Sequence, residues 1–328
     1  MRRRWLFPAL AAALPLAGPA FAEDDFSAPF TLSHPRPVEP DAPLPPTPGG
    51  PAPDIAFGAF QRGYYLTAFR EATKRVADNP KDAPAMTLLG EIYRDGLVVR
   101  QDLVEAARWY RLAAGLGDKN AQFQLGVMLL EDGEAKDKVV ARGLFEKAAA
   151  QGHAGALYNL GVLAIQGDDS AKPDFAKAAD YFKRAADAGD DNGAYSYGVL
   201  LRDGKGVPLD TALAAAWLKR AADGGIIAGQ VEYAIMLFNG IGVERDETGA
   251  AKIFKLAAAR KNPIAQNRLA HLYLIGRGVP QDIVQVALWH SFAKAAGIED
   301  AELDAAIAHL TPDQAKQVRE LERKQMEF

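Results

Sequence analysis

The titratable side chains of this 328-residue chain are scattered and do not form a recognisable catalytic set. Histidine is the residue type best suited to acid–base chemistry near neutral pH and to metal binding. We find no H-E-x-x-H, G-x-S-x-G or Walker sequence, and the G-x-G pairs recur in turns between helices instead of following strands. We therefore predict no catalytic residue, no metal site and no cofactor, and expect a protein that is not an enzyme. The histidines stand far apart, at His34, His153, His271, His290 and His309.

A patch of aspartates is the other candidate for ion binding. Its spacing lacks the alternating oxygen ligands of a calcium loop, so solvated turn and helix-cap residues are the simpler interpretation. The absence of cysteine also excludes disulfides, thiolate zinc sites and a cysteine nucleophile. The patch consists of Asp168, Asp169, Asp174, Asp187, Asp190 and Asp191.

Composition and charge indicate a folded protein whose partners are neither nucleic acid nor anionic lipid. Hydrophobic residues make up 49% of the chain, which is ample for a continuous core. The formal net charge is −4, and removal of Arg2, Arg3 and Arg4 with a leader segment would take it to about −7. A negative chain of this kind is repelled by phosphate backbones and acidic membranes.

The first 22 residues are typical of a secretory signal peptide. Basic residues are followed by an apolar stretch and by the small-residue site Ala20-Phe21-Ala22. A membrane anchor is the alternative, but the stretch is short and interrupted by prolines. We expect cleavage after Ala22, no membrane insertion after cleavage and, in a Gram-negative source, a periplasmic protein. Arg3-Arg4 leaves the choice between general and twin-arginine export open.

Residues 23–53 form a proline-rich segment, and the stretch from Pro29 to Pro53 holds ten of the twenty prolines. Such a segment is expected to be a disordered linker with extended, polyproline-like character. One interpretation is a P-x-x-P ligand for a proline-reading domain. The simpler interpretation is a spacer between the export signal and the fold.

From about Ile55 onward the chain repeats with a period near 36 residues, which predicts stacked helix-turn-helix units. In each unit an aspartate begins the second helix, and eleven residues after it there is always an alanine. Thirteen residues after that alanine there is a small residue in the first helix of the next unit. The length variation therefore falls in the turn, where it costs little, while packed helices keep their register. The aspartates are Asp102, Asp137, Asp174, Asp210, Asp246 and Asp282. The small residues are Gly90, Gly126, Gly161, Gly198, Ala234 and Ala270.

The repeated pattern, A-x-x-x-L-G-x-x-Y-x-x-G-x-G-V-x-x-D-x-x-x-A-x-x-W-x-x-x-A-A-x-x-G, resembles the Sel1-like repeat, a relative of the tetratricopeptide repeat. It is nearly complete in residues 194–225 and 265–297. The resemblance implies an all-α, right-handed α-solenoid of six repeats over residues 82–297. Ahead of them, residues 54–81 are expected to form a degenerate capping repeat, and residues 298–328 to form capping helices. Departures from the pattern are Val98 in a turn, a short turn near Asp132, and Leu144 and Ile253 in place of the aromatic.

The tetratricopeptide-type groove positions, carried onto the first helices, predict a partner-binding groove on the concave side. Its middle is apolar and its ends are charged or polar, which is the pattern of a protein-binding patch. An alternative remains open, namely that these apolar side chains pack between neighbouring units. The candidate groove residues are Phe123, Val127, Leu130, Tyr158, Val162, Ile165, Arg202, Ile235, Phe238 and His271.

We expect the function to be that of a periplasmic scaffold or adaptor that binds a segment of a partner protein in its groove, in envelope assembly or signalling. The resemblance suggests a variant, since some exported members restrain a membrane sensor kinase and residues 57–60 loosely resemble their amino-terminal unit. A second alternative is a peptidoglycan-binding or penicillin-binding and -hydrolysing protein. Exported relatives of that type carry a disulfide in every unit, whereas this chain has no cysteine.

Overall fold

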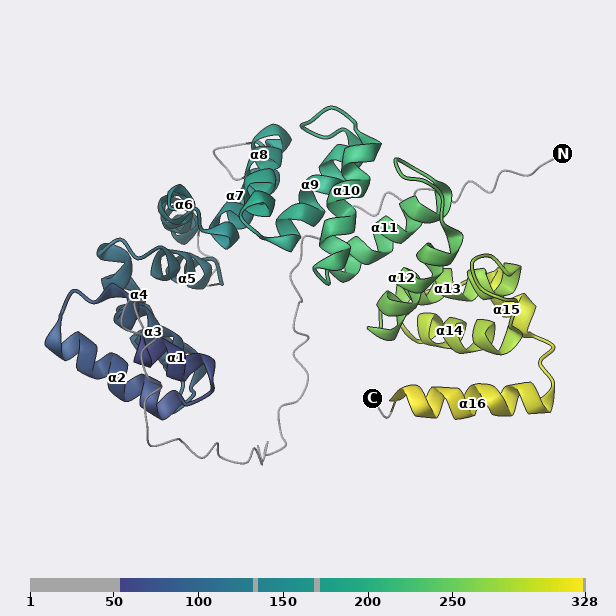
Figure 1. The fold of residues 1–328 in the computed structure, drawn as a ribbon, viewed down its shortest axis with the longest axis horizontal. Helices are drawn as coiled ribbons and strands as arrows, with labels where there is room; N and C mark the ends of the chain where they lie inside the picture. Colours follow the sequence, from purple (N-terminus) through teal and green to yellow (C-terminus); the bar gives the residue numbers. More distant parts are fainter. Residues whose placement is uncertain (1–53, 132–134, 168–171, 327–328) are drawn as a thin grey trace, which may run out of the picture.

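The structure is a computed structural model that describes residues 54–131, 135–167 and 172–326, and in these ranges every regular element is an α-helix. The helices follow one another in pairs, and Figure 1 shows the pairs side by side along a curved arch. This is the all-helical solenoid that the repeat predicted. The proposed signal peptide and linker, residues 1–53, lie outside the described residues.

Each repeat contributes a first and a second helix, nearly all of them 13 residues long. The first helices are α3 (Ala83–Asp95), α5 (Lys119–Glu131), α7 (Ala154–Gln166), α9 (Asp191–Asp203), α11 (Ile227–Asn239) and α13 (Pro263–Ile275). The second helices are α4 (Leu103–Gly115), α6 (Ala135–Ala150), α8 (Phe175–Asp187), α10 (Thr211–Asp223), α12 (Glu247–Ala259) and α14 (Ile283–Ala295).

Two further helix pairs lie at the ends of the stack. At the start, α1 (Ile55–Gln61) and α2 (Tyr65–Asp78) form a pair, and α2 packs against α3. At the other end, α15 (Ala301–Ile307) and α16 (Pro312–Met326) both pack against α14. Thr311 and Gln314 cap α16 reciprocally, each accepting a hydrogen bond from the backbone amide of the other.

Aspartate side chains fix the start of most second helices. In α4, α10 and α12 the N-cap carboxylate accepts a hydrogen bond from the amide three residues on, at 2.8 to 2.9 Å. Asp137 is the exception to the sequence expectation, because α6 already begins at Ala135 and Asp137 lies inside its first turn. The preceding turn is shorter than the others, so the helix starts three residues earlier than expected, and the carboxylate of Asp137 interacts with the helix dipole instead of capping.

The second glycine of the turn brings neighbouring repeats into backbone contact. Gly206 and Gly242 have φ values of 72° and 69°, a region that favours glycine. A Cβ atom at Gly206 would lie 2.2 Å from the carbonyl carbon of Phe175, and one at Gly242 would lie 2.0 Å from the carbonyl oxygen of Thr211. Each turn therefore lies on the beginning of the previous second helix, which leaves no room for a side chain.

The two helices of a repeat approach most closely at the small residue of the first helix. A Cβ atom at Gly161 would lie 2.5 Å from Cε1 of Phe182, and one at Gly126 would lie 2.6 Å from Cε1 of Phe145. The large side chain from the second helix thus lies directly on the backbone of the first helix, and it is almost completely buried in every repeat. These large residues are Tyr110, Phe145, Phe182, Leu218, Phe254 and His290.

The C-terminal pair is joined to the last repeat by a partly buried polar contact. Asp300, the N-cap of α15, accepts hydrogen bonds from Asn267 at 2.9 Å, from His271 at 2.7 Å and from the Leu303 amide at 3.1 Å. Burial alone would raise the pKa of Asp300, but these hydrogen bonds outweigh burial and lower the pKa to about 2.

The close approach predicts that Gly161→Val destabilises the protein by about 2 to 3 kcal/mol, because the added methyl groups overlap the Phe182 ring. Gly143→Val in α6 is the matched control, since a Cβ atom at Gly143 meets nothing within 4 Å. We expect the control to change stability by less than about 0.5 kcal/mol, because valine is no worse than glycine in a helix. Urea unfolding followed by circular dichroism measures both, and equal effects of the two substitutions would contradict the packing argument.

The depressed pKa predicts that Asp300→Asn costs roughly 1 to 2 kcal/mol at neutral pH. The folded-state pKa is lower than the unfolded one, so the ionised carboxylate stabilises the fold above about pH 4. That contribution is lost as the pH falls towards 2. Asparagine keeps the cap but lacks the charge. Urea unfolding of both proteins should differ at pH 7 and converge near pH 2, and a difference that is constant over this range would exclude the linkage.

Candidate partner-binding groove

Three positions on each first helix form a single stripe next to the helix–helix contact. They lie three residues before, one residue after and four residues after the small residue, and at about 100° per residue they fall within about 60° of one another. We call these the groove positions. In Figure 1, α5 and α7 lie on the inner side of the arch and α6 and α8 on the outer side. The first helices therefore line the concave side of the central repeats.

The groove positions of α5 and α7 form what we call the apolar floor. All six side chains are half-buried, so each one packs against the core with one side and remains accessible on the other. Packing against the core, one of the two interpretations left open by the sequence, therefore holds for these residues, and the partner-binding groove stays a prediction. The apolar floor consists of Phe123, Val127, Leu130, Tyr158, Val162 and Ile165.

Aromatic contacts hold the two rings of the apolar floor in place. Phe123 stacks on His153 at a centroid distance of 4.4 Å and lies 5.9 Å from the ring of Phe145. Tyr158 lies 5.6 Å from the ring of Phe182. Burial raises the pKa of Tyr158, so its hydroxyl is neutral and its ring presents an uncharged surface. Both rings are thus anchored by the large residues that make the close helix–helix contact.

The groove positions of α9 and α13 include polar residues, whereas those of α11 are apolar but two of them, Val231 and Phe238, are buried. Arg202 contacts Asp203 at 2.8 Å and reaches Glu232 on the next first helix at 2.5 Å. Ile235 is half-buried. His271 is hydrogen-bonded to Asp300, and this contact joins the last repeat to α15. At the other end of the stack, Arg94 similarly links Asp95 to Gln124.

Phe238 differs from the expected surface anchor. Its side chain is only 4% exposed, and the guanidinium of Arg277 lies over its ring at 4.3 Å from the centroid. Arg277 is itself held by Glu247, at 2.7 Å and 3.0 Å. The turn after α13 therefore covers Phe238, and a partner would not meet this ring on an open surface.

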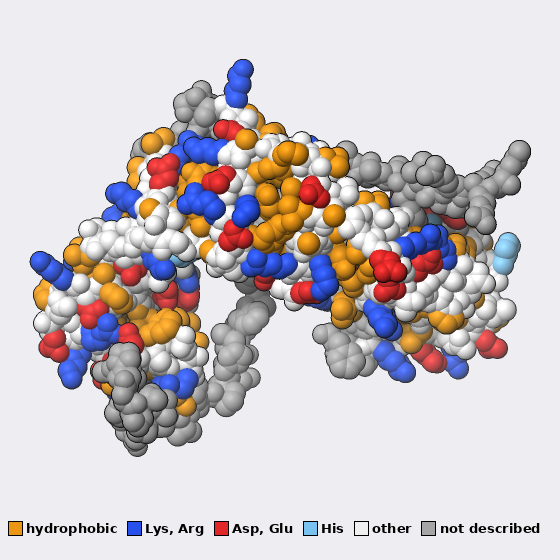
Figure 2. Space-filling model, turned by 45° about the horizontal axis from the view of Figure 1, so that its top comes forward, with side chains coloured by type: hydrophobic (Ala, Val, Ile, Leu, Met, Phe, Trp, Pro, Cys, Tyr) orange, Lys and Arg blue, Asp and Glu red, His pale blue; other side chains and the backbone are white. Residues whose placement is uncertain are grey.

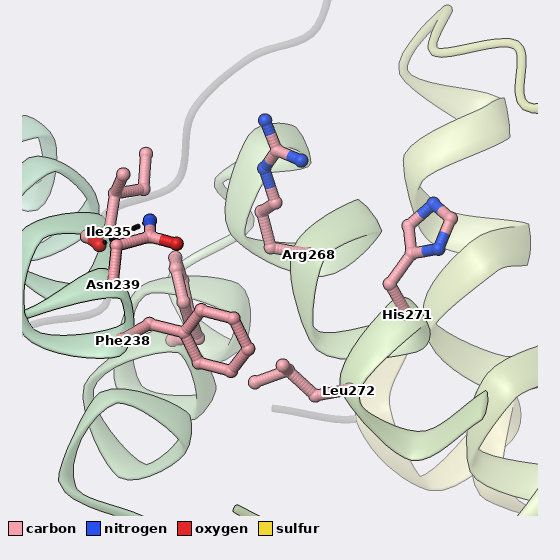
Figure 3. A pocket seen from close by; sticks show the side chains of 7 residues that line it. Ile235, Phe238, Asn239, Arg268, His271 and Leu272 are labelled. Carbon is pink, nitrogen blue, oxygen red and sulfur yellow. Dashed lines mark hydrogen bonds between the residues drawn. The ribbon is translucent and has the colours of Figure 1, made fainter. Parts of the chain in front are cut away.

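A small apolar pocket lies between α11 and α13. In Figure 3, Phe238 and Leu272 face each other at its base, Ile235 and Asn239 stand on one side and Arg268 and His271 on the other. Burial lowers the pKa of Arg268, and Asp300 and Glu232 counteract this effect. The pocket is lined by Ile235, Phe238, Asn239, Phe254, Arg268, His271 and Leu272.

The sequence interpretation missed one aromatic residue of the groove. From α9 it named only Arg202, but the residue three positions before Gly198 is Tyr195, which is half-buried. Tyr195 therefore occupies the same place on the stripe as Phe123 and Tyr158. The constant spacing to the small residue was the signal that could have identified Tyr195.

Two of the histidines make contacts that hold helices in place. His153 caps α7 through Nδ1, which accepts a hydrogen bond from the Ala156 amide at 3.1 Å, and His290 contacts Asp304 at 2.9 Å. Within residues 54–131, 135–167 and 172–326, no group of three or more His, Cys, Asp or Glu side chains could hold a metal ion. The same ranges contain no helix long and apolar enough to cross a membrane.

The space-filling view in Figure 2 brings the outer side of the arch forward, where hydrophobic side chains gather over the central part with basic and acidic side chains around them. On the concave side, the six half-buried side chains of the apolar floor offer an accessible apolar surface, which suits the binding of another polypeptide.

Comparison with known proteins agrees with the repeat period. The family model described as Sel1 repeat matches residues 83–118, 119–153, 154–190, 192–226, 227–262 and 263–296. No curated protein matches the sequence.

Two solved structures share the fold. One is c5321, a protective antigen of uropathogenic Escherichia coli strains that displays an SLR fold; it is 24% identical with a TM-score of 0.70, and the match covers 83% of this chain and 61% of that protein. This chain therefore spans less than two thirds of its length. The other is a Sel1 repeat protein from Oxalobacter formigenes, 26% identical with a TM-score of 0.63, covering 75% of this chain and 97% of that one. With six matched repeats that together span well over half of the sequence, the chain belongs to the Sel1 repeat family.

Proposed function

We propose that this protein is an exported adaptor that binds an extended segment of a partner protein along the concave side of its first helices. Sel1 repeats generally mediate protein–protein interaction. The observation that carries the proposal is the apolar floor, six half-buried apolar side chains side by side on α5 and α7. Apolar side chains that remain accessible beside a rigid core are the usual anchors of a protein interface.

The charges around the apolar floor favour a particular kind of partner segment. Arg94 and Arg202 flank it, and each is already paired with an aspartate and reaches the next first helix. Such paired charges contribute little affinity but restrict orientation. We therefore expect a segment with apolar side chains in its middle and polar groups at its ends.

Binding should depend on the apolar floor and not on the outer surface. Val162→Asp places a charge in the middle of the floor and should weaken partner binding at least about tenfold, because the carboxylate would lose water on complex formation. Val139→Asp on α6 is the matched control, since Val139 is 71% exposed on an outer helix. Crosslinking and affinity purification from intact cells compares both variants with the parent chain. Retention of all partners by Val162→Asp, with unchanged circular dichroism, would refute the groove.

The export proposal rests on residues 1–22, which lie outside the described part of the chain. We propose a periplasmic location with cleavage between Ala22 and Glu23. Mass spectrometry of the protein recovered from the cell envelope fraction should find Glu23 as the first residue. An intact N-terminus at Met1, or recovery only from the cytosol, would refute export.

A further inference from the structure

Three aromatic side chains form a row across successive first helices. They are Phe123 of α5, Tyr158 of α7 and Tyr195 of α9, each three residues before the small residue and each half-buried. Phe123 lies against Gly155 of α7, where a Cβ atom would be 3.1 Å from its ring. Tyr158 is hydrogen-bonded to Ser196 of α9, which is the residue next to Tyr195. We call these three residues the aromatic row.

The spacing of the aromatic row is set by the stacking of the helices. Because Phe123 and Tyr158 reach the next first helix, we expect neighbouring rings to be separated by one interaxial distance, about 10 Å. A polyproline II helix has three residues per turn and rises about 3.1 Å per residue, so equivalent positions recur about every 9.3 Å. A ligand of this kind with an apolar ring at every third residue would match the row.

The proline-rich segment of this chain contains such a stripe. Pro37, Pro40, Pro43 and Pro46 are spaced by three residues, so a polyproline II helix would place all four on one face. The other two faces mix apolar, polar and charged residues. One face holds Val38, Asp41, Leu44 and Thr47, and the other holds Arg36, Glu39, Ala42 and Pro45.

We propose that residues 37–46 bind in cis to the aromatic row, with Pro46 on Phe123, Pro43 on Tyr158 and Pro40 on Tyr195. Residues 37–46 lie outside the described part of the chain, which begins at Asp54 directly before α1. Proline rings packed on aromatic side chains are the general means of recognising polyproline II segments. The inference replaces the simple spacer expected from composition with an internal ligand.

The length of chain before α1 allows this placement. Eight peptide units join Pro46 to Asp54 and span at most about 28 Å. Phe123 lies on α5, and the stack passes from α1 through α3 to α5 in two steps. At about 10 Å per step, Phe123 lies about 20 Å from α1 along the stack. The segment would then run along the solenoid in the opposite direction to the repeats.

This inference rests on the proposed function, because the internal segment would occupy the same surface as the partner. A tethered ligand has an effective concentration in the millimolar range, so even a weak contact would be populated. A partner must then displace the segment, and the segment sets the minimum affinity that a productive partner needs.

The absence of cysteine makes a distance measurement straightforward. One spin label is attached at Asp41→Cys, which is off the proline stripe, and the other at Gln166→Cys, at the end of α7. Pulsed electron paramagnetic resonance on the purified chain then measures the distance between the two labels. We expect one narrow distance peak between about 20 and 30 Å, since Gln166 lies eight residues, or about 12 Å, beyond Tyr158 on the same helix. An unbound tether from Asp54 to Asp41 would instead give a broad distribution with a root-mean-square span of about 20 Å.

Matched variants test the pairing. Alanine at Pro37, Pro40, Pro43 and Pro46 should broaden the peak, whereas alanine at Pro35, Pro45, Pro48 and Pro51 removes as many prolines off the stripe and should leave it narrow. Tyr158→Ser should broaden it as well. Equal behaviour of the two proline variants, or a narrow peak that survives Tyr158→Ser, would overturn the inference.

Two further outcomes are decisive. A narrow peak that disappears when labelled chain is diluted into a tenfold excess of unlabelled chain would show binding between copies and overturn the cis arrangement. A broad peak in the parent chain would overturn it directly. Neither result affects the Val162→Asp comparison, so a failure of the internal ligand and a failure of the partner groove can be distinguished.

Discussion

At the middle of each repeat, a large side chain of the second helix lies on the backbone of the first helix where glycine or alanine leaves room for it. Phe182 on Gly161 and Phe145 on Gly126 are representative. The contact fixes how close the two helices come and how the first helix is rotated about its axis. Because dense packing tolerates little displacement, the same geometry is imposed on every unit of the stack.

The rotation of the first helix decides what reaches the concave surface. The small residue faces its own second helix, so the stripe about 60° away from it faces the groove. Residues on that stripe are half in the core and half in solvent, as Phe123 and Tyr158 illustrate through their contacts with Phe145 and Phe182. The same side chains therefore contribute to core packing and to the apolar surface of the concave side.

The repeats are not equivalent in their surface chemistry. All three stripe positions are apolar and half-buried in α5 and α7. In α9 the stripe carries Arg202, which is paired with Glu232, and in α11 two of its three apolar side chains are buried. Side chains of the last repeat already have partners within the fold, because His271 contacts Asp300 and Arg277 covers Phe238 of the repeat before it. The part of the arch that remains accessible to an apolar ligand thus lies over the central repeats.

The sequence by itself determined the repeat, its register and the family. The constant intervals of eleven and thirteen residues reflect packing that cannot change length, and the aspartates and glycines marked most helix starts and turns because caps and positive φ values are local requirements. Asp137 was misplaced because the exact start of a helix after a shortened turn depends on how the pair packs.

The tertiary structure decided which apolar residues are accessible. Phe238 and Val162 are both apolar groove candidates, but Phe238 is covered by Arg277, which arrives from the turn beyond α13. Likewise, the large residue facing each small residue comes from a different helix, and the identity of Tyr195 as a groove residue follows from the rotation which that contact imposes. Periodicity along one helix records which side is apolar, whereas exposure depends on side chains that approach from elsewhere in the stack.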